Sequence, residues 1–269
     1  MLTIAIPFYN AERFLASAID SVISQTYTEW QLILIDDGSK DNSLKIANQY
    51  AKNYSNISVL SDGKNKNLAF RLNQIPNLVS TKYLARMDAD DIMHPERIAK
   101  QIEILEKNPN IDVLGTNAFT IDENDNVLGI RMSPDYKLKK VRGFIHPTIM
   151  AKTEWFRDNL YDAEAFRIED TELWYRTSNK YNFMCLNEPL LFYREIGNDY
   201  YKKYFLANSC KQYILSKYNN NPFWRKFFIL NIVKGSIYRF YNFFGLEQIL
   251  VNKRNEILFD RKQNYKEFL

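Results

Sequence analysis

The chain has 269 residues, of which 46% are hydrophobic and 25% are charged. This balance is typical of a globular protein and excludes a wholly disordered chain. The formal net charge is only +4, so the overall charge does not indicate a nucleic-acid-binding protein.

The two cysteines and the N-terminus bear on the cellular compartment. Cys185 and Cys210 form no Cys-x-x-Cys pair and have no histidine at a spacing that suits zinc, so free thiols in a reducing compartment are expected. The first ten residues have no basic region and no long apolar stretch, and are not a signal peptide. No run approaches the roughly 20 apolar residues of a membrane-spanning helix. The sequence predicts a cytoplasmic protein that contacts a membrane, if at all, only peripherally on its inner face.

Short apolar runs alternate with helical spacing over the first 90 residues. The runs predict buried strands, and apolar residues three or four positions apart predict helices. Asp41 is the expected N-cap of the second helix. Because strand and helix alternate, we predict an α/β fold with right-handed crossovers and a mostly parallel, Rossmann-like sheet. The expected strands are 2–6, 32–35, 57–60 and 83–87, and the expected helices are 14–23, 44–51 and 68–79.

The rest of the chain is less regular. Pro95 suits the first position of a helix, and the polar residues 122–126 separate two apolar runs and predict a hairpin. From about Tyr200 the pattern is helical and mixes basic with aromatic residues, with a boundary expected near Gly197-Asn198. The expected elements are helix 95–108, hairpin strands 113–121 and 127–132, strand 148–152, helix 169–180 and strand 183–192.

Four polar segments are expected to converge, because ligands of an open parallel sheet bind at the carboxyl ends of its strands. Carboxylates that lie close together repel, and their pKa values rise unless a cation lies among them. Asp88 and Asp90 point to the same side of an extended turn and can face one ligand. Hard oxygen ligands favour Mg²⁺ or Mn²⁺, with a diphosphate filling the remaining positions of the metal. The four segments are 7–10, 36–39, 88–91 and 169–170.

No glycine-rich phosphate-binding loop follows the first predicted strand. Dinucleotide-binding and P-loop proteins hold phosphate with backbone amides at that place, and Pro7 removes one such amide. The sheet is therefore expected to bind a nucleotide whose phosphate charge is neutralised by metal.

Five motifs, in this order, resemble family 2 of the glycosyltransferases, whose catalytic domain has the GT-A fold. The resemblance covers about residues 2–195. It implies a GT-A catalytic domain 1–196, with a nucleotide-sugar-binding half of about 1–92 and an acceptor half of about 93–196. A helical, aromatic and basic extension, 197–269, follows. The motifs are 4–10, 24–26 with 32–39, 86–97, 146–150 and 169–174.

The resemblance implies roles for residues of the donor site. Pro7, Tyr9 and Glu12 would line the nucleotide pocket, and Asp37 would hydrogen-bond the base, usually uracil. The sequence departs from the family pattern at Asn67, where relatives often have a glycine before the helix. That departure concerns the local shape of the donor loop.

The resemblance also implies the chemistry. Asp88 would lie near the ribose or the sugar, and Asp90 would bind the Mn²⁺ or Mg²⁺ that bridges the diphosphate of a UDP-sugar. Asp170 would be the general base that takes the proton of the acceptor hydroxyl. A base and a leaving nucleotide on opposite faces of the sugar give a single displacement with inversion. The expected acceptor is a glycan or a lipid-linked glycan of bacterial-type surface polysaccharide or lipopolysaccharide synthesis.

Some residues near these motifs have two interpretations. His146 either helps to hold phosphate or metal, or is a structural histidine with satisfied hydrogen bonds. Glu172, Trp174 and Arg176 are expected to belong to the surface and packing of their helix.

The basic and aromatic extension also leaves two interpretations open. A helix of this composition lies on an anionic membrane, with rings inserted and cations at the headgroups, or packs on the catalytic domain or a second subunit. The aromatic and apolar residues are Phe223, Trp224, Phe227, Phe228, Ile232 and Tyr238, and the cations are Arg225, Lys226, Lys234 and Arg239.

Two rival functions predict sequence features that differ from those of a transferase. A nucleotidyltransferase would show a glycine-rich, basic loop after the first strand, which residues 7–10 are not. An inactive, membrane-associated binding module would be favoured by loss of Asp90 or Asp170, and both are present.

Overall fold

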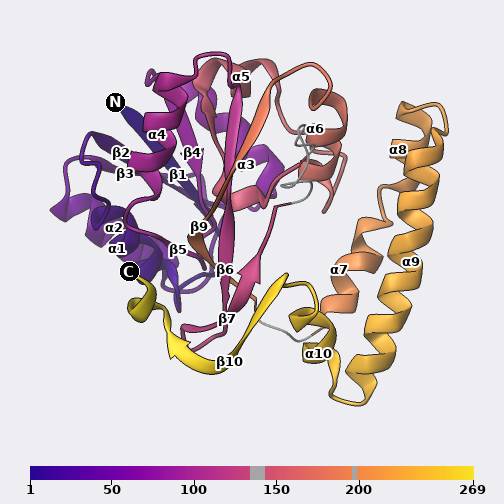
Figure 1. Cartoon of the computed structure of the whole chain (residues 1–269). Helices are drawn as coiled ribbons and strands as arrows, with labels where there is room; N and C mark the ends of the chain where they lie inside the picture. The colour runs from indigo at the N-terminus through magenta and orange to yellow at the C-terminus, as the bar shows by residue number, and fades with distance from the viewer. Residues whose placement is uncertain (134–142, 196–198) are drawn as a thin grey trace.

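The computed structural model describes residues 1–133, 143–195 and 199–269 (Figure 1). The boundary expected at Gly197-Asn198 falls outside the described residues. In chain order the described helices and strands are β1 Leu2–Phe8, α1 Leu15–Ile23, β2 Trp30–Asp36, α2 Ser43–Asn53, β3 Ile57–Ser61, α3 Leu68–Leu78, β4 Tyr83–Arg86, β5 Ile92–Met93, α4 Arg97–Lys107, β6 Val113–Ile121, β7 Asn126–Arg131, η1 His146–Thr148, β8 Met150–Lys152, α5 Thr153–Asp158, α6 Glu169–Thr177, β9 Phe183–Arg194, α7 Tyr200–Ala207, α8 Lys211–Lys217, α9 Pro222–Phe243, α10 Glu247–Asn252, β10 Ile257–Asn264 and η2 Tyr265–Phe268.

One sheet runs through the molecule in the order β10-β7-β6-β8-β4-β1-β2-β3, and β9 pairs with both β6 and β5. Strands β3, β2, β1 and β4 are parallel, as the alternation of strand and helix predicted. The expected hairpin is present as β6 and β7, which pair antiparallel. Because parallel strands end at the same edge of a sheet, the segments that follow β1, β2 and β4 meet there.

Side chains of β1 alternate between two layers of helices. Leu2, Ile4 and Ile6 share a core with residues of α1, α2 and α4, whereas Ala5 shares one with residues of α3, α5 and α6. All seven residues of the strand are buried. A strand covered on both faces has no solvent side, which is why a continuous apolar run predicts it correctly.

The start of α2 differs slightly from expectation. The N-cap is Asn42, and its side chain makes no capping hydrogen bond. Asp41, the expected N-cap, lies one residue earlier, and its Oδ1 accepts hydrogen bonds from Ser43 N at 3.0 Å and Ser43 Oγ at 2.6 Å.

The C-terminal extension lies beside the sheet as helices α7 to α10 and then returns to it as β10 (Figure 1). The expectation of helix from Tyr200 onward is wrong for this last segment, because β10 pairs antiparallel with β7. The physical cause is long-range packing: Phe259 and Phe268 join a cluster with Phe119 and Phe192 of β6 and β9. Within the described ranges, no helix combines the length and the hydropathy needed to cross a membrane.

Candidate active site

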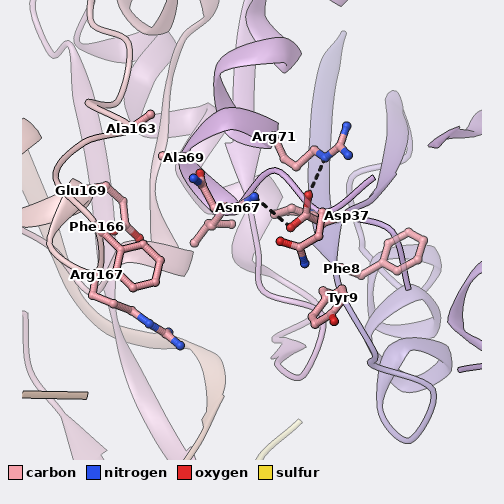
Figure 2. A pocket seen from close by; sticks show the side chains of 13 residues that line it. Phe8, Tyr9, Asp37, Asn67, Ala69, Arg71, Ala163, Phe166, Arg167 and Glu169 are labelled. Carbon is pink, nitrogen blue, oxygen red and sulfur yellow. Dashed lines mark hydrogen bonds and ion pairs between the residues drawn. The ribbon is translucent and has the colours of Figure 1, made fainter. Parts of the chain in front are cut away.

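A cavity of about 370 Å³ lies at the carboxyl ends of β1 and β2 (Figure 2). Its wall includes Pro7, Tyr9 and Asp37, which the sequence analysis grouped at one site. The opposite wall comes from the loop that leads into α6, so segments far apart in sequence enclose it. The other lining residues are Phe8, Asn65, Asn67, Leu68, Ala69, Arg71, Ala163, Phe166, Arg167 and Glu169.

Asp37 is held by the loop before α3 and by a buried arginine (Figure 2). Its Oδ1 accepts hydrogen bonds from Lys66 N and Arg71 Nε, both at 2.8 Å, and its Oδ2 accepts one from Asn67 N at 3.1 Å. Arg71 is 1% exposed and also donates to Asp62 Oδ1 at 2.6 Å. Because a carboxylate offers about four acceptor sites, Asp37 keeps one for a ligand in the cavity.

Asn67 has a backbone conformation that suits glycine. Its φ is +73° and its ψ is 165°, a backbone region that residues other than glycine rarely adopt. Its side-chain oxygen accepts a hydrogen bond from Phe70 N at 3.1 Å and so caps α3. The asparagine therefore keeps the local shape that a glycine would give, and adds a helix cap.

Glu12 does not line the cavity. Its Oε2 accepts hydrogen bonds from the backbone N and the side-chain Nδ2 of Asn42, both at 2.9 Å. Its own N–H donates to Asp41 Oδ2 at 3.0 Å. These bonds hold the loop after β1 against the start of α2, and the place of Glu12 in the nucleotide pocket stays a prediction.

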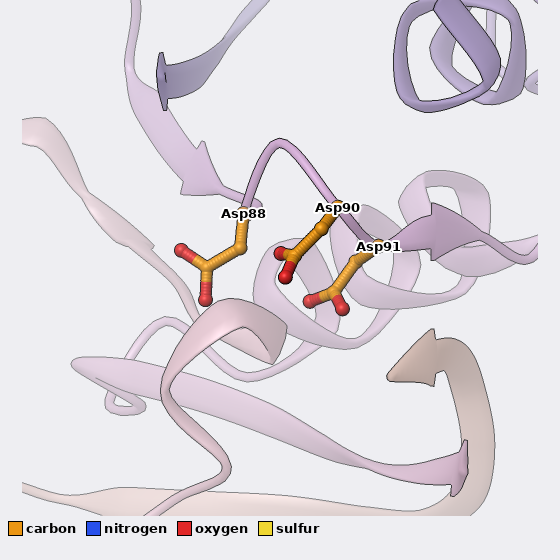
Figure 3. Close-up of side chains that lie close together, drawn as sticks. All are labelled: Asp88, Asp90 and Asp91. Atoms are coloured by element: carbon orange, nitrogen blue, oxygen red, sulfur yellow. The ribbon is translucent and has the colours of Figure 1, made fainter. Parts of the chain in front are cut away.

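Three carboxylates gather directly after β4 (Figure 3). One oxygen from each of Asp88, Asp90 and Asp91 lies within 4.8 Å of the other two. Burial, followed by the charge of Asp88, raises the pKa of Asp90 to about 6. Burial, followed by the charge of Asp90, raises the pKa of Asp91 well above its usual value. These directions are the expected consequence of carboxylates crowded together with too little positive charge among them.

The cluster fits a hard divalent cation. Asp91 Oδ1 accepts a hydrogen bond from Arg194 N at 2.9 Å, but Asp91 Oδ2 is buried and accepts none within the described part of the chain. Arg194 also holds the backbone of Asp90, through a bond from its Nε to the Asp90 carbonyl at 2.7 Å. Held carboxylate oxygens with unused acceptor capacity are the donor set that Mg²⁺ and Mn²⁺ prefer.

A buried arginine connects this cluster with a second acidic pair. Arg86 is 2% exposed, and its Nη2 forms an ion pair with Asp88. Burial works against its charge, yet nearby acidic groups, with Asp88 first and Glu169 among them, raise its pKa. The carboxylates after β4 and those at the start of α6 therefore lie around one cation.

Glu169 and Asp170 are the first two residues of α6, where the helix dipole favours negative charge. Burial, followed by the charge of Asp170, raises the pKa of Glu169 to about 7. Burial also raises the pKa of Asp170, against the effect of a 2.6 Å hydrogen bond from Thr171 N. Only Glu169 of the two belongs to the wall of the cavity.

The structural interpretation of His146 agrees with its contacts. Its Nε2 lies 2.8 Å from the hydroxyl of Tyr161, and its ring meets Trp174 edge-on. Burial, followed by the charge of Arg86, lowers the pKa of His146 well below its usual value.

Glu172 is fully buried, which corrects its placement at a helix surface. It accepts hydrogen bonds from Arg176 Nε at 3.0 Å, Lys217 Nζ at 2.8 Å and Tyr218 OH at 2.5 Å. Because Lys217 and Tyr218 belong to the extension, this carboxylate joins α6 to α8.

Sequence reasoning missed two cations at the site. Arg167 lines the cavity and has a backbone φ of +67°. Lys203 of α7 and Asp90 interact electrostatically: the charge of Lys203 acts to lower the pKa of Asp90, and the charge of Asp90 acts to raise the pKa of Lys203. Burial lowers the pKa of Lys203, and its Nζ lies 4.1 Å from the centre of the Tyr200 ring. Among the described residues neither cation has a carboxylate within ion-pair distance. Neither carries a sequence signal, because both lie outside the motifs.

Curated relatives of this chain are glycosyltransferases. It is 36% identical over 213 residues to the putative glycosyltransferase EpsE of Bacillus subtilis, covering 76% of each protein. It is 29% identical over 232 residues to the O-antigen biosynthesis glycosyltransferase WbnJ of Escherichia coli, covering 81% of this chain and 89% of WbnJ.

Solved structures share the fold at low sequence identity. S. aureus TarS 1-349 in complex with UDP superposes with a TM-score of 0.61 at 17% identity, covering 78% of this chain but only 65% of the TarS fragment. The mannosyltransferase PcManGT from Pyrobaculum calidifontis, in complex with GDP-Man and Mn²⁺, has a TM-score of 0.63 at 12% identity, covering 80% of this chain and 64% of PcManGT. The fold is therefore the GT-A fold. Residues 3–218 match the family described as Glycosyl transferase family 2, and the chain belongs to that family.

Proposed function

We propose that this glycosyltransferase moves a sugar from a UDP-sugar to a hydroxyl of a glycan or lipid-linked acceptor, with inversion at the anomeric carbon. The observation that carries the proposal is the carboxylate cluster of Asp88, Asp90 and Asp91 at the sheet edge that also forms the cavity. The name of the relative WbnJ supports a role in surface polysaccharide synthesis.

The cavity suits a nucleoside. Asp37 has an acceptor site to spare for a ring N–H of the base, which uracil provides. The ring of Tyr9 is 50% exposed and lies in the cavity wall beside Pro7, where a base can stack on it. Arg71 holds Asp37 in place through their ion pair. The proposal therefore assigns Pro7, Tyr9 and Asp37 to the nucleoside.

The diphosphate is assigned to the cations near the carboxylates. Asp90 would bind Mn²⁺ or Mg²⁺, with Asp88 nearest the ribose or the sugar, and the metal would stabilise negative charge on the departing diphosphate. Arg167 and Lys203 have no carboxylate partner within ion-pair distance among the described residues. They are therefore free to bind phosphate oxygens by charge-assisted hydrogen bonds.

Asp170 is proposed as the general base. Its ionised carboxylate takes the proton of the acceptor hydroxyl while that oxygen bonds to the anomeric carbon. The bond from the anomeric carbon to the diphosphate oxygen breaks in the same step. Attack from the face opposite the leaving group inverts the configuration. The neighbouring Glu169 would hold the sugar from the cavity wall.

The test is release of nucleoside diphosphate from a panel of UDP-sugars and GDP-sugars with Mn²⁺, Mg²⁺ or a chelator. Asp90→Asn and Asp170→Asn are expected to lose at least about 100-fold in turnover, because each removes an interaction made in the transition state. Glu103→Gln is the control, since Glu103 is an exposed residue of α4. NMR of the product reports the anomeric configuration.

Two outcomes would overturn the proposed reaction, and a third would move the role of the base from Asp170 to Glu169. Turnover that persists in the chelator and in Asp90→Asn would exclude the metal role. Pyrophosphate release from a nucleoside triphosphate and a sugar phosphate, with no turnover of any nucleotide sugar, would favour a nucleotidyltransferase. If Glu169→Gln loses more activity than Asp170→Asn, the base is Glu169.

A further inference from the structure

The outer face of α9 carries a continuous apolar stripe. Its side chains are exposed, with Phe240 at 63% and Ile229 at 58%. At about 100° per residue they fall within an arc of about 100°, which keeps them on one side of the helix. The stripe consists of Ile229, Leu230, Val233, Ile237, Phe240 and Phe244.

The opposite face of α9 packs on its own chain. Trp224, Phe228 and Tyr238 are buried, and Gly235 lies so close to Phe205 of α7 that a Cβ there would meet its ring at 2.9 Å. Trp224, Phe228 and Tyr238 are three of the aromatic residues for which the sequence left contact with a membrane open. They form the core between α7, α8 and α9 instead, so the exposed stripe is a different set of residues.

The charges of α9 are all positive. Arg225, Lys226, Lys234 and Arg239 are exposed, and the helix contains no acidic residue. At about 100° per residue, Lys234 borders the stripe on one side and Arg225 on the other, with Arg239 farther round on the side of Arg225, while Lys226 lies in line with the stripe one turn before it. The stripe is therefore framed by cations.

We propose that this face of α9 binds the surface of a membrane that contains anionic lipids. Apolar and aromatic side chains of such a helix enter the interface, while flanking cations meet the lipid phosphates. A second copy of the chain is a poorer occupant, because two α9 faces would bring like charges together with no acid on either helix. The matched family region ends at residue 218, so the surface lies outside it.

Contacts with α6 connect the extension to the active site, and Tyr175 of α6 packs on Phe223 and Trp224 of α9. Glu172 joins α8 to α6, the helix that begins with Glu169 and Asp170. Docking would therefore present the site to acceptors at the membrane surface. The inference does not depend on the proposed reaction, because lipid binding is measured without turnover.

The test is co-sedimentation of the full chain with vesicles of phosphatidylglycerol or of phosphatidylcholine. Binding is expected to phosphatidylglycerol only, and to weaken at high salt. Val233→Ser with Phe240→Ser is expected to weaken binding at least tenfold. Leu78→Ser with Leu160→Ser is the matched control, since both residues are exposed elsewhere, and is expected to bind like the wild type.

A charge pair completes the test. Arg225→Gln with Lys234→Gln is expected to weaken binding about 25-fold, since each cation near an anionic surface contributes about fivefold. Lys45→Gln with Lys52→Gln, on α2, is its control. Absence of binding, or equal binding to both lipids, overturns the proposal. So does a dimer in light scattering that the Val233 and Phe240 changes dissociate, which would assign the face to a second copy.

Discussion

Asn67 allows the strain in the donor loop to be measured. A side chain in its backbone region costs about 1–3 kcal/mol, which Asn67→Gly would release. Two effects oppose this gain in stability. Loss of the side-chain cap on Phe70 N costs a few tenths of a kcal/mol when glycine replaces asparagine. The greater conformational freedom of glycine in the unfolded chain costs about 0.5–1 kcal/mol. We therefore expect Asn67→Gly to be as stable as the wild type or up to about 2 kcal/mol more stable.

Asn221 supplies the matched control. It also caps a helix, α9, by accepting a hydrogen bond from Phe223 N at 2.9 Å, but its φ is −48°. Asn221→Gly releases no strain and is expected to cost about 1 kcal/mol. Urea unfolding measures both, and the difference between the two variants is the strain at Asn67. Equal destabilisation by both glycines would refute the reasoning.

Three further predictions concern the site and its support. The kcat/KM value should rise as pH increases from 5 to 8, because the pKa of the proposed base Asp170 is raised, the pKa of its neighbour Glu169 is raised to about 7, and a carboxyl group cannot accept a proton while it holds one; a flat profile over that range would contradict this. Glu172→Gln should lower the free energy of unfolding by about 1–3 kcal/mol, since it weakens a buried ionic network, whereas Glu103→Gln at the surface should change it by less than about 0.5 kcal/mol. Arg71→Lys should raise the KM for the donor about tenfold with little change in kcat, because lysine cannot hold Asp37 and Asp62 at once; an unchanged KM would remove Arg71 from the donor site.

The parallel half of the sheet is predictable because its signals are local. Each strand is an apolar run, and β1 and β2 end in the polar turns that form the cavity. The grouping of Asp37, Asp88 and Asp90 at one edge follows from the parallel order alone. Site geometry within that edge is also accessible, since the crowding of the three carboxylates of Asp88, Asp90 and Asp91 predicts the direction in which the pKa values of Asp90 and Asp91 shift.

The failures of prediction concern residues whose state depends on distant partners. The sequence of β10 includes Asp260 and Arg261, and its strand conformation depends on the free edge of β7 and on a cluster with Phe119. Glu172 follows two acids at a helix start, which locally indicates an exposed position. Only the approach of Lys217 and Tyr218 makes its burial possible.

Two buried carboxylates bind the extension to the preceding part of the chain. Glu172 accepts a hydrogen bond from Lys217 of α8. Glu195, which directly follows β9, accepts hydrogen bonds from Arg254 Nη1 at 2.9 Å and from the hydroxyl of Tyr200 at 3.0 Å. Breaking either network would leave charge buried without a partner, so the packed arrangement is strongly preferred. This packing places Lys203 of α7 close enough to Asp90 for their charges to interact. A part of the chain that resembles a membrane appendage in sequence thus also supplies a cation to the proposed diphosphate site.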